Sequence, residues 1–343
     1  MAVILALESS CDDSAAALVS SDRQILAQAI VGQADRHRPF GGVVPEIAAR
    51  AHVEILPGLV RQVLHEADMT VGEVDAIAAT AGPGLVGGVM VGLLAGKGLA
   101  LSANKPLVAV NHLEGHALSP RLTDAELRFP YLLLLTSGGH CQLLEVRGVG
   151  DYRRLATTID DAAGEAFDKS AKLLGLGYPG GPAVERLAKD GDPEAIAFPR
   201  PLVGSGEPHF SFAGLKSAVQ RAVQAGAHDA ADIAASFQQA VVDCLVDRTR
   251  LALEESDAPS LVVAGGVAAN ASVRAALQAL AQKNGRHFSV PPMWLCTDNA
   301  AMIGWAGAER FAAGLTDDLD VPARARWPLD DTADKVRGAG VKA

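Results

Sequence analysis

Two histidines four residues apart, His112 and His116 in the stretch NHLEGHALSP, are the residues whose spacing most clearly suggests chemistry. Imidazoles at positions i and i+4 lie about 40° apart around a helix and can bind one metal ion together. Metal-dependent peptidases use the related pattern HExxH, in which the glutamate directly follows the first histidine. Here Glu114 lies two residues after His112, about 200° around the helix, and points to the opposite side. The spacing therefore favours a metal site and disfavours a peptidase, with two ordinary histidines as the alternative.

Three aspartates are further candidates for a functional site, one as a metal ligand and two as proton acceptors. Asp298, in TDNAAMIGW, precedes a predicted helix, where a carboxylate is more often an N-cap than a metal ligand. Asp12 and Asp13, in ESSCDDS, lie at the tip of a predicted hairpin and could accept a proton during a reaction. Aspartates at such tips more often form the turn, so the pattern alone leaves both roles open.

Two predicted β-hairpins position these groups. Residues 3–7 and 15–19 are apolar strands on either side of ESSCDDS, and residues 131–146 repeat the arrangement around SGGH. A repeated hairpin indicates a duplicated lobe, and 343 residues are enough for two domains. The chain therefore predicts an α/β protein with two related lobes.

The remaining segments fit this scheme. Residues 74–88 and 261–270 predict a strand, a glycine turn and the start of a helix. Residues 151–258 are mostly helical by pattern, a linker is expected near residues 120–130, and the tail after residue 322 is expected to be poorly ordered.

Composition limits the classes of function. The formal net charge of -10 repels phosphate backbones, so a nucleic-acid substrate would need a local basic rim or a basic partner. The four cysteines form no CxxC pair, and the N-terminus is not a signal peptide, which together favour the cytoplasm. The apolar run at residues 85–103 contains Lys97 and five glycines, which is more typical of a packed core helix than of a membrane span.

Ten short motifs occur in an order that resembles the TsaD family of tRNA adenosine threonylcarbamoyltransferases. They are ESSCDDS from Glu8, GGVVPE from Gly41, TAGPGLVG from Thr80, HLEGH from His112, SGGH from Ser137, IDDAAGEAFDK from Ile159, YPGGP from Tyr178, FSFAGLK from Phe210, AGGVAAN from Ala264 and CTDN from Cys296. Each motif is weak by itself, but the ordered set covers nearly the whole chain.

The resemblance implies the actin-like ATPase (ASKHA) superfold, with two ribonuclease-H-like lobes flanking a nucleotide cleft. Residues 1–125 would form the N-terminal lobe, completed by a helix within residues 299–330, and residues 126–298 would form the C-terminal lobe.

The resemblance also assigns site residues. His112, His116 and Asp298 would bind one divalent metal ion per subunit, with iron(II) favoured and zinc or magnesium as alternatives. The residues expected to bind the adenylate substrate are Leu135, Thr136, Ser137, Gly138, Gly139, Asp168, Gly181, Glu185 and Asn270. This sequence has Thr136 and Cys141 where relatives have valine and threonine, and neither change removes a proposed metal ligand.

The implied activity is transfer of threonylcarbamoyl from L-threonylcarbamoyl-AMP to N6 of adenosine 37 in tRNAs that read ANN codons, with release of AMP. The implied partners are tRNA, a TsaB-like paralogue and a TsaE-like ATPase, with no membrane. An actin-fold phosphotransferase or ATPase, which would transfer a γ-phosphate with magnesium, is the first alternative. A non-catalytic nucleotide-binding scaffold is the second.

Overall fold

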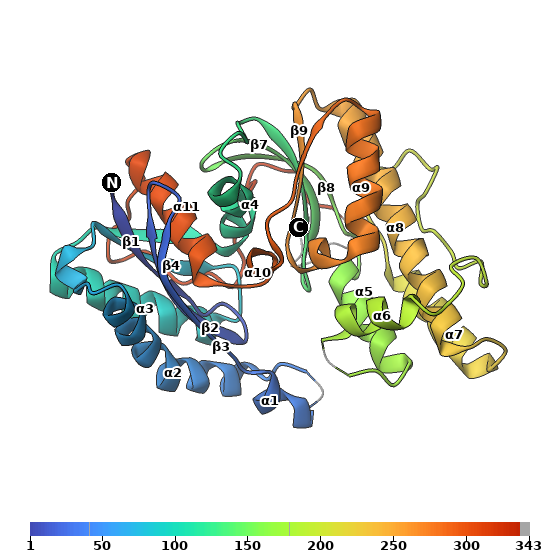
Figure 1. Ribbon diagram of the computed structural model, residues 1–343, viewed down its shortest axis with the longest axis horizontal. Coiled ribbons are helices and arrows are strands. Elements are labelled where there is room, and N and C mark those ends of the chain that lie inside the picture. Colours follow the sequence, from blue (N-terminus) through green and yellow to red (C-terminus); the bar gives the residue numbers. More distant parts are fainter. Residues whose placement is uncertain (41, 178, 337–343) are drawn as a thin grey trace. The chain divides into compact units, whose positions relative to one another are not determined.

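The structure, a computed structural model, describes residues 1–40, 42–177 and 179–336. The chain divides into two compact units (Figure 1). Unit 1 consists of Met1–Glu126, Val149–Asp151 and Thr297–Asp331. Unit 2 consists of Leu127–Gly148, Tyr152–Cys296 and the segment that begins at Thr332. Within the described residues, each unit contains one mixed sheet of five strands.

The sheet of unit 1 has the strand order β3-β2-β1-β4-β5. Strand β1 pairs antiparallel with β2 and parallel with β4, and β4 pairs parallel with β5. The hairpin predicted around ESSCDDS is therefore confirmed. The strands are β1 (Val3–Glu8), β2 (Asp13–Ser20), β3 (Ile25–Gly32), β4 (Ala76–Gly82) and β5 (Leu107–Asn111).

Helices cover both faces of this sheet, which explains why β1 and β4 are buried at every position instead of every second one. A Cβ added at Gly96 would lie 2.8 Å from Ala79 on one face, and a Cβ at Gly307 would lie 2.7 Å from Ala78 on the other. Glycine at these helix positions allows close packing on the sheet. The helices are α1 (Ala34–His37), α2 (Pro45–Glu66), α3 (Val86–Ala103), α4 (His112–Thr123) and α11 (Ala300–Ala312), with 3-10 turns at Arg38–Phe40 and Val71–Glu73.

Among the described residues, α3 is the one helix long and apolar enough to cross a membrane. Its glycine-lined side packs against the sheet, and its Lys97 Nζ donates a hydrogen bond of 2.6 Å to Val321 O. We therefore identify α3 as a core helix, as the sequence predicted.

The sheet of unit 2 has the order β10-β9-β6-β7-β8, which is the connectivity of unit 1 repeated. Strand β6 pairs antiparallel with β7 and parallel with β9, as β1 does with β2 and β4. The structure thus confirms the predicted duplication. The strands are β6 (Tyr131–Thr136), β7 (Cys141–Gly148), β8 (Asp151–Thr157), β9 (Ser260–Ala264) and β10 (His287–Ser289).

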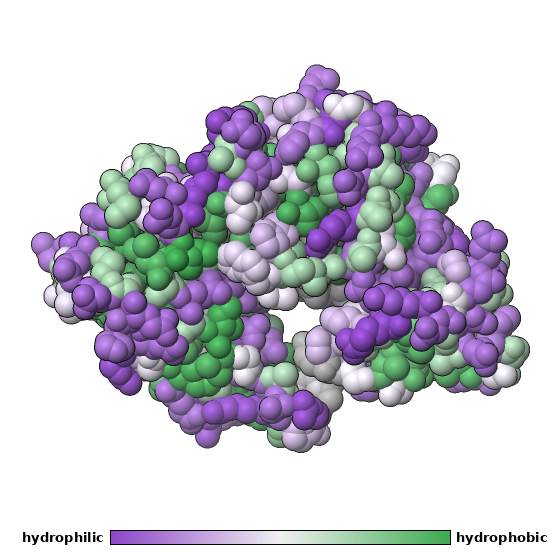
Figure 2. Space-filling model, in the orientation of Figure 1, coloured by the Kyte–Doolittle hydropathy of each residue, from purple (hydrophilic) through white to green (hydrophobic). Residues whose placement is uncertain are grey.

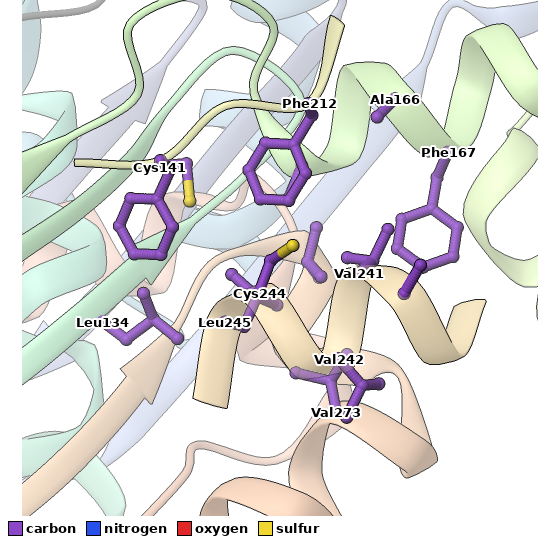
Figure 3. Packing of buried hydrophobic residues seen from close by; sticks show 14 of the residues in the cluster. Leu134, Cys141, Ala166, Phe167, Phe212, Val241, Val242, Cys244, Leu245 and Val273 are labelled. Carbon is purple, nitrogen blue, oxygen red and sulfur yellow. The ribbon is translucent and has the colours of Figure 1, made fainter. Parts of the chain in front are cut away.

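The core of unit 2 lies between this sheet and its helices (Figure 3). Phe167 meets Phe237 edge-on, with ring centroids 5.2 Å apart, while Phe212, Cys244 and Leu134 are buried in the same cluster. The helices are α5 (Ala163–Leu173), α6 (Gly180–Ala188), α7 (Ala213–Ala225), α8 (Ala230–Glu255), α9 (Ala271–Lys283) and α10 (Met293–Cys296), with a 3-10 turn at Gly266–Ala269.

Two expectations need correction. Strand β8 was missed within the region expected to be mostly helical; it is half exposed and carries charged residues, which weakens the apolar pattern of a strand. The tail after residue 322 was expected to be poorly ordered, but Arg324 N donates to Ala81 O at 2.8 Å and Arg324 stacks over Trp327. Residues 337–343, which end that tail, lie outside the described residues.

Candidate functional site

The histidine pair follows directly from the way α4 begins. Strand β5 ends at Asn111, whose side chain caps the helix by accepting a hydrogen bond of 2.9 Å from Leu113 N. The Asn111 Nδ2 donates to Trp327 O, also at 2.9 Å, so the C-terminal segment fixes the cap. His112 and His116 are consequently one turn apart on the same side of α4, with ring centroids 4.9 Å apart.

Asp298 joins this pair although 182 residues separate it from His116. Its Oδ1 lies 3.1 Å from His116 Nε2 and 3.5 Å from His112 Nε2. The N-cap of α11 is Asn299, which accepts from Met302 N at 2.8 Å. The interpretation of Asp298 as the cap is therefore wrong, and its carboxylate is directed at the histidines instead.

The three side chains form a group that could hold a metal ion. One ligand atom from each lies within 4.8 Å of the others, and the side chain of Asp298 is 28% exposed, so a ligand can reach the group from solvent. Two imidazole nitrogens and one carboxylate oxygen leave coordination positions open, as catalytic sites with three protein ligands do. The donor set therefore fits a divalent transition metal.

Without a cation, these groups compensate one another electrostatically. Burial alone would raise the pKa of Asp298, yet the neighbouring His112 and His116 hold this pKa well below its usual range. Burial alone would lower the pKa of His112, but the charges of Asp298 and Glu8 raise it well above the ordinary value. The carboxylate is therefore ionised and already aimed at the positive charge that a metal would bring.

Glu8 supports the site and was not among the predicted residues. Its Oε2 lies 3.0 Å from His112 Nδ1 and accepts from Thr80 Oγ1 at 2.6 Å, while Oε1 accepts from Ser10 N at 2.5 Å. Although burial alone would raise the pKa of Glu8, His112 lowers it. The sequence did contain a signal, namely an acidic residue that ends a fully apolar strand.

Glu114 faces away from the metal candidates, as the helical geometry predicted. It is buried, its Oε1 accepts from Gly150 N at 2.9 Å, and its Oε2 accepts from Arg310 Nη1 at 3.0 Å. The carboxylate thus ties α4 to α11 and has its partners on that side. A peptidase-like role for Glu114 beside the histidines has no support in this geometry.

Asp12 and Asp13 lie where β2 begins, both partly buried. Burial, followed by the charges of Asp298, Asp12 and Glu8, raises the pKa of Asp13 to about 7. A carboxyl group with a pKa near neutrality is suited to proton transfer. His52 helps to hold this hairpin tip, because its Nε2 lies 3.1 Å from Cys11 O and its Nδ1 lies 2.7 Å from Ser14 Oγ.

The residues expected to bind the adenylate lie in unit 2. Leu135 and Thr136 end β6 and are fully buried. Ser137 shapes the following turn, since its Oγ accepts from His140 N at 3.1 Å. Apart from each glycine and its two chain neighbours, no atom of the described residues lies within 4 Å of a Cβ built on Gly138 or Gly139, so space remains beside both glycines.

Two other glycines hold this turn in place, and site prediction missed both. A Cβ at Gly265, which has φ of +92°, would lie 2.5 Å from Thr136 O. A Cβ at Gly164 would lie 2.5 Å from Ser137 O. Both belong to quoted motifs, AGGVAAN and IDDAAGEAFDK, but a sequence does not show which backbone approaches which glycine.

Asp168, Glu185 and Asn270 each accept a hydrogen bond from a backbone N–H at the start of a helix. Asp168 Oδ1 accepts from Gly180 N at 2.8 Å, and its pKa is raised by burial. Glu185 Oε1 accepts from Ala271 N at 2.8 Å, and Asn270 caps α9 while donating to Gln238. A Cβ on Gly181 would meet nothing within 4 Å among the described residues, and a hollow of about 470 Å³ opens at the next residue, Pro182. Its lining includes Glu185, Arg186, Lys189, Arg274, Gln278 and Met293.

Comparison with known families gives one match over most of the chain. Residues 24–305 match the family model described as "TsaD: tRNA N6-adenosine threonylcarbamoyltransferase". A protein of that name from Sphingopyxis alaskensis is 72% identical over 100% of both chains. Another from Novosphingobium aromaticivorans is 67% identical, again over 100% of both chains.

Solved structures share the fold at low sequence identity. Component A of the (R)-2-hydroxyglutaryl-CoA dehydratase of Acidaminococcus fermentans matches with a TM-score of 0.53 and 17% identity, over 91% of this chain and 97% of that one. The HypF of T. kodakarensis matches with a TM-score of 0.62 and 16% identity, over 92% of this chain and 48% of that one. With the duplicated sheets, these likenesses show the predicted actin-like (ASKHA) fold.

Proposed function

The chain belongs to the TsaD family of tRNA N6-adenosine threonylcarbamoyltransferases, and from this premise we propose how its residues carry out the transfer. It transfers a threonylcarbamoyl group to adenosine in tRNA. We propose L-threonylcarbamoyl-AMP as the donor and N6 of adenosine 37, in tRNAs that read ANN codons, as the acceptor. This is acyl transfer from a mixed anhydride to a weakly nucleophilic amine.

The transfer requires one bond to form and one to break. N6 of the adenosine bonds to the carbamoyl carbon, the bond from that carbon to the AMP phosphate oxygen breaks, and N6 loses one proton. We propose that Asp13, with Asp12 as the alternative, accepts this proton. The pKa of about 7 that burial gives Asp13 supports the assignment, since a base near the operating pH is efficient.

We propose that His112, His116 and Asp298 hold one divalent ion, with iron(II) favoured over zinc or magnesium. An ion bound there would supply Lewis-acid polarisation of a carbonyl or phosphate oxygen. The chain's own contribution is to present two imidazole nitrogens and one carboxylate oxygen within 4.8 Å of one another. The imidazoles favour iron or zinc over magnesium, which prefers oxygen ligands.

For the adenylate we propose the turn from Leu135 to Gly139, with Asp168 and Gly181 at the ribose and Asn270 near the base. The space beside Gly138, Gly139 and Gly181 supports this assignment. Asp168 accepts from the backbone N–H groups of Gly180 and Gly181, and a carboxylate has further lone pairs that can accept from a ribose hydroxyl. Glu185, at the edge of the adjoining hollow, is the outermost candidate.

We propose that the protein works in the cytoplasm with a TsaB-like paralogue and a TsaE-like ATPase. One surface of unit 1 supports a protein partner, because Val53 of α2 and Val86, Met90 and Leu94 of α3 are large apolar side chains left exposed. Hydrophobic residues gather where α2 and α3 lie against each other (Figure 2). An apolar surface of this kind is typical of protein interfaces. We further propose that units 1 and 2 are the two ribonuclease-H-like lobes.

The convergence of His112, His116 and Asp298 in a chain of this family is the observation that carries the proposal. The test is nucleoside analysis of tRNA after incubation with the protein, its partners and threonylcarbamoyl-AMP, with and without a chelator. We expect modified adenosine and AMP only when the metal is present, and activity restored by added iron(II). Modification at full rate in chelator would overturn the metal-dependent mechanism, and consumption of ATP alone would favour the phosphotransferase alternative.

A further inference from the structure

The two histidines of the candidate metal group differ in what holds their second ring nitrogen. His112 Nδ1 lies 3.0 Å from Glu8 Oε2, whereas His116 Nδ1 is buried without a hydrogen-bond partner among the described residues. Both Nε2 atoms face Asp298. The Nδ1 of His112 is therefore held by a hydrogen bond, whereas His116 is held by a hydrogen bond only at Nε2, to Asp298 at 3.1 Å.

Glu8 is itself held rigidly. All but 1% of its surface is buried, and both carboxylate oxygens accept hydrogen bonds, Oε1 from Ser10 N and Oε2 from Thr80 Oγ1. Because Glu8 ends β1 and Thr80 belongs to the neighbouring β4, the sheet fixes the position of the carboxylate. An acceptor placed in this way leaves His112 few ring orientations.

The chemistry of this contact selects one tautomer of His112. An ionised carboxylate can only accept, so His112 Nδ1 must carry the proton and donate it to Glu8. Ser10 Oγ, 3.1 Å from the same nitrogen, can accept from the same N–H. In the neutral ring, which is the form that binds a metal, the lone pair is then on Nε2, the nitrogen beside Asp298.

We propose that Glu8 is a positioning residue of the metal centre, which holds His112 in the Nδ1–H tautomer with Nε2 free to bind the cation. The inference rests on the proposed metal site and adds a residue to it. A carboxylate that binds the second nitrogen of a metal-ligating histidine also makes that histidine a stronger ligand, and losing such a partner typically costs about 10- to 100-fold in metal affinity.

The test uses the full-length protein with cobalt(II) as the probe metal and a competing chelator to obtain Kd. We expect Glu8→Gln, which keeps the volume but loses the charge, to weaken cobalt binding about 10- to 100-fold. Glu309→Gln is the matched control, because Glu309 is a mostly buried acid of the same unit that pairs with Arg121 at 2.8 Å. It should leave the Kd unchanged.

A second readout separates positioning from general destabilisation. In the zinc-loaded wild type, nitrogen-15 NMR of histidine should show His112 with its proton on Nδ1, and Glu8→Gln should shift this resonance while that of His116 stays in place. Should Glu8→Gln fail to fold, Thr80→Val removes one hydrogen bond from Glu8 and should weaken cobalt binding about 3-fold.

The outcomes are distinguishable. A wild type that binds no cobalt and no iron would refute the proposed metal site. A wild type that binds, together with Glu8 variants of equal Kd and unchanged His112 resonance, would refute the positioning role alone.

Discussion

The two units share one strand order, but the residues at the ends of their strands differ in what they contact. In unit 1, side chains at the ends of the strands contact one another: Glu8 at the end of β1 reaches His112, which follows β5, and His112 approaches Asp298. In unit 2, Asp168 accepts from Gly180 N at the start of α6, Asn270 caps α9, and the glycines of the SGGH turn have open space beside them. A buried, mutually compensated set suits a small cation, whereas open backbone suits a larger substrate.

Loss of a metal ligand should have the largest effect. His116→Ala and Asp298→Ala should each lower metal affinity by more than about 100-fold, because losing even a residue that only supports a ligand typically lowers metal affinity about 10- to 100-fold. Threonylcarbamoyl transfer should fall with it. Metal analysis of the purified variants and nucleoside analysis of tRNA measure both quantities. The exposed His65→Ala variant is the control, and full metal content in His116→Ala would contradict the assignment.

A change in unit 2 should separate substrate binding from metal binding. Asp168→Asn should raise KM for threonylcarbamoyl-AMP about 10- to 100-fold, as expected for loss of a hydrogen bond to a charged group. Metal content should not change. Steady-state kinetics measure the KM, and metal analysis of the same variant measures the metal content. If Asp168→Asn lost metal and kept its KM, the division of tasks between the units would be wrong.

The opposite side of α4 should matter for stability and not for the metal. Glu114→Gln should lower the free energy of unfolding by about 1–3 kcal/mol, because Arg310 loses its charged partner in a buried place. Denaturant unfolding measures this, and metal content is the internal control. Metal loss comparable to that in His116→Ala would mean that Glu114 does more than fix the helix.

The smallest expected effect concerns Asp13. Its folded-state pKa of about 7 exceeds the ordinary aspartate value of 3.8, so the folded state binds the proton more tightly than the unfolded state. This group therefore stabilises the metal-free fold at low pH, and its contribution declines as pH rises from about 4 through 7. Asp13→Asn should remove this pH dependence of the free energy of unfolding, which denaturant unfolding at several pH values measures. Carbon-13 NMR should show the Asp13 carboxyl titrating near pH 7. In Asp298→Asn the pKa of Asp13 should be lower, because one neighbouring negative charge is gone.

Much of the fold was predictable from local patterns. The two hairpins have apolar strands around polar turns, and their repetition indicated the duplicated architecture that both sheets show. Strand β8 was not predictable in this way, because at half-exposed positions it tolerates charged residues and loses its apolar signature. Likewise, the tail around Trp327 lacks a periodic pattern, and its order comes from contacts with α3, β4 and Asn111.

The sequence by itself determined that His112 and His116 share one side of a helix and that Glu114 does not, because helical geometry depends only on spacing. Only the tertiary structure decided that Asn299 caps α11 and leaves Asp298 for the histidines, and that Glu8 reaches His112 from a strand 104 residues away. These contacts depend on how the strands are ordered in the sheet. Contacts between residues distant in sequence are set by burial of the whole core, and no local pattern records them.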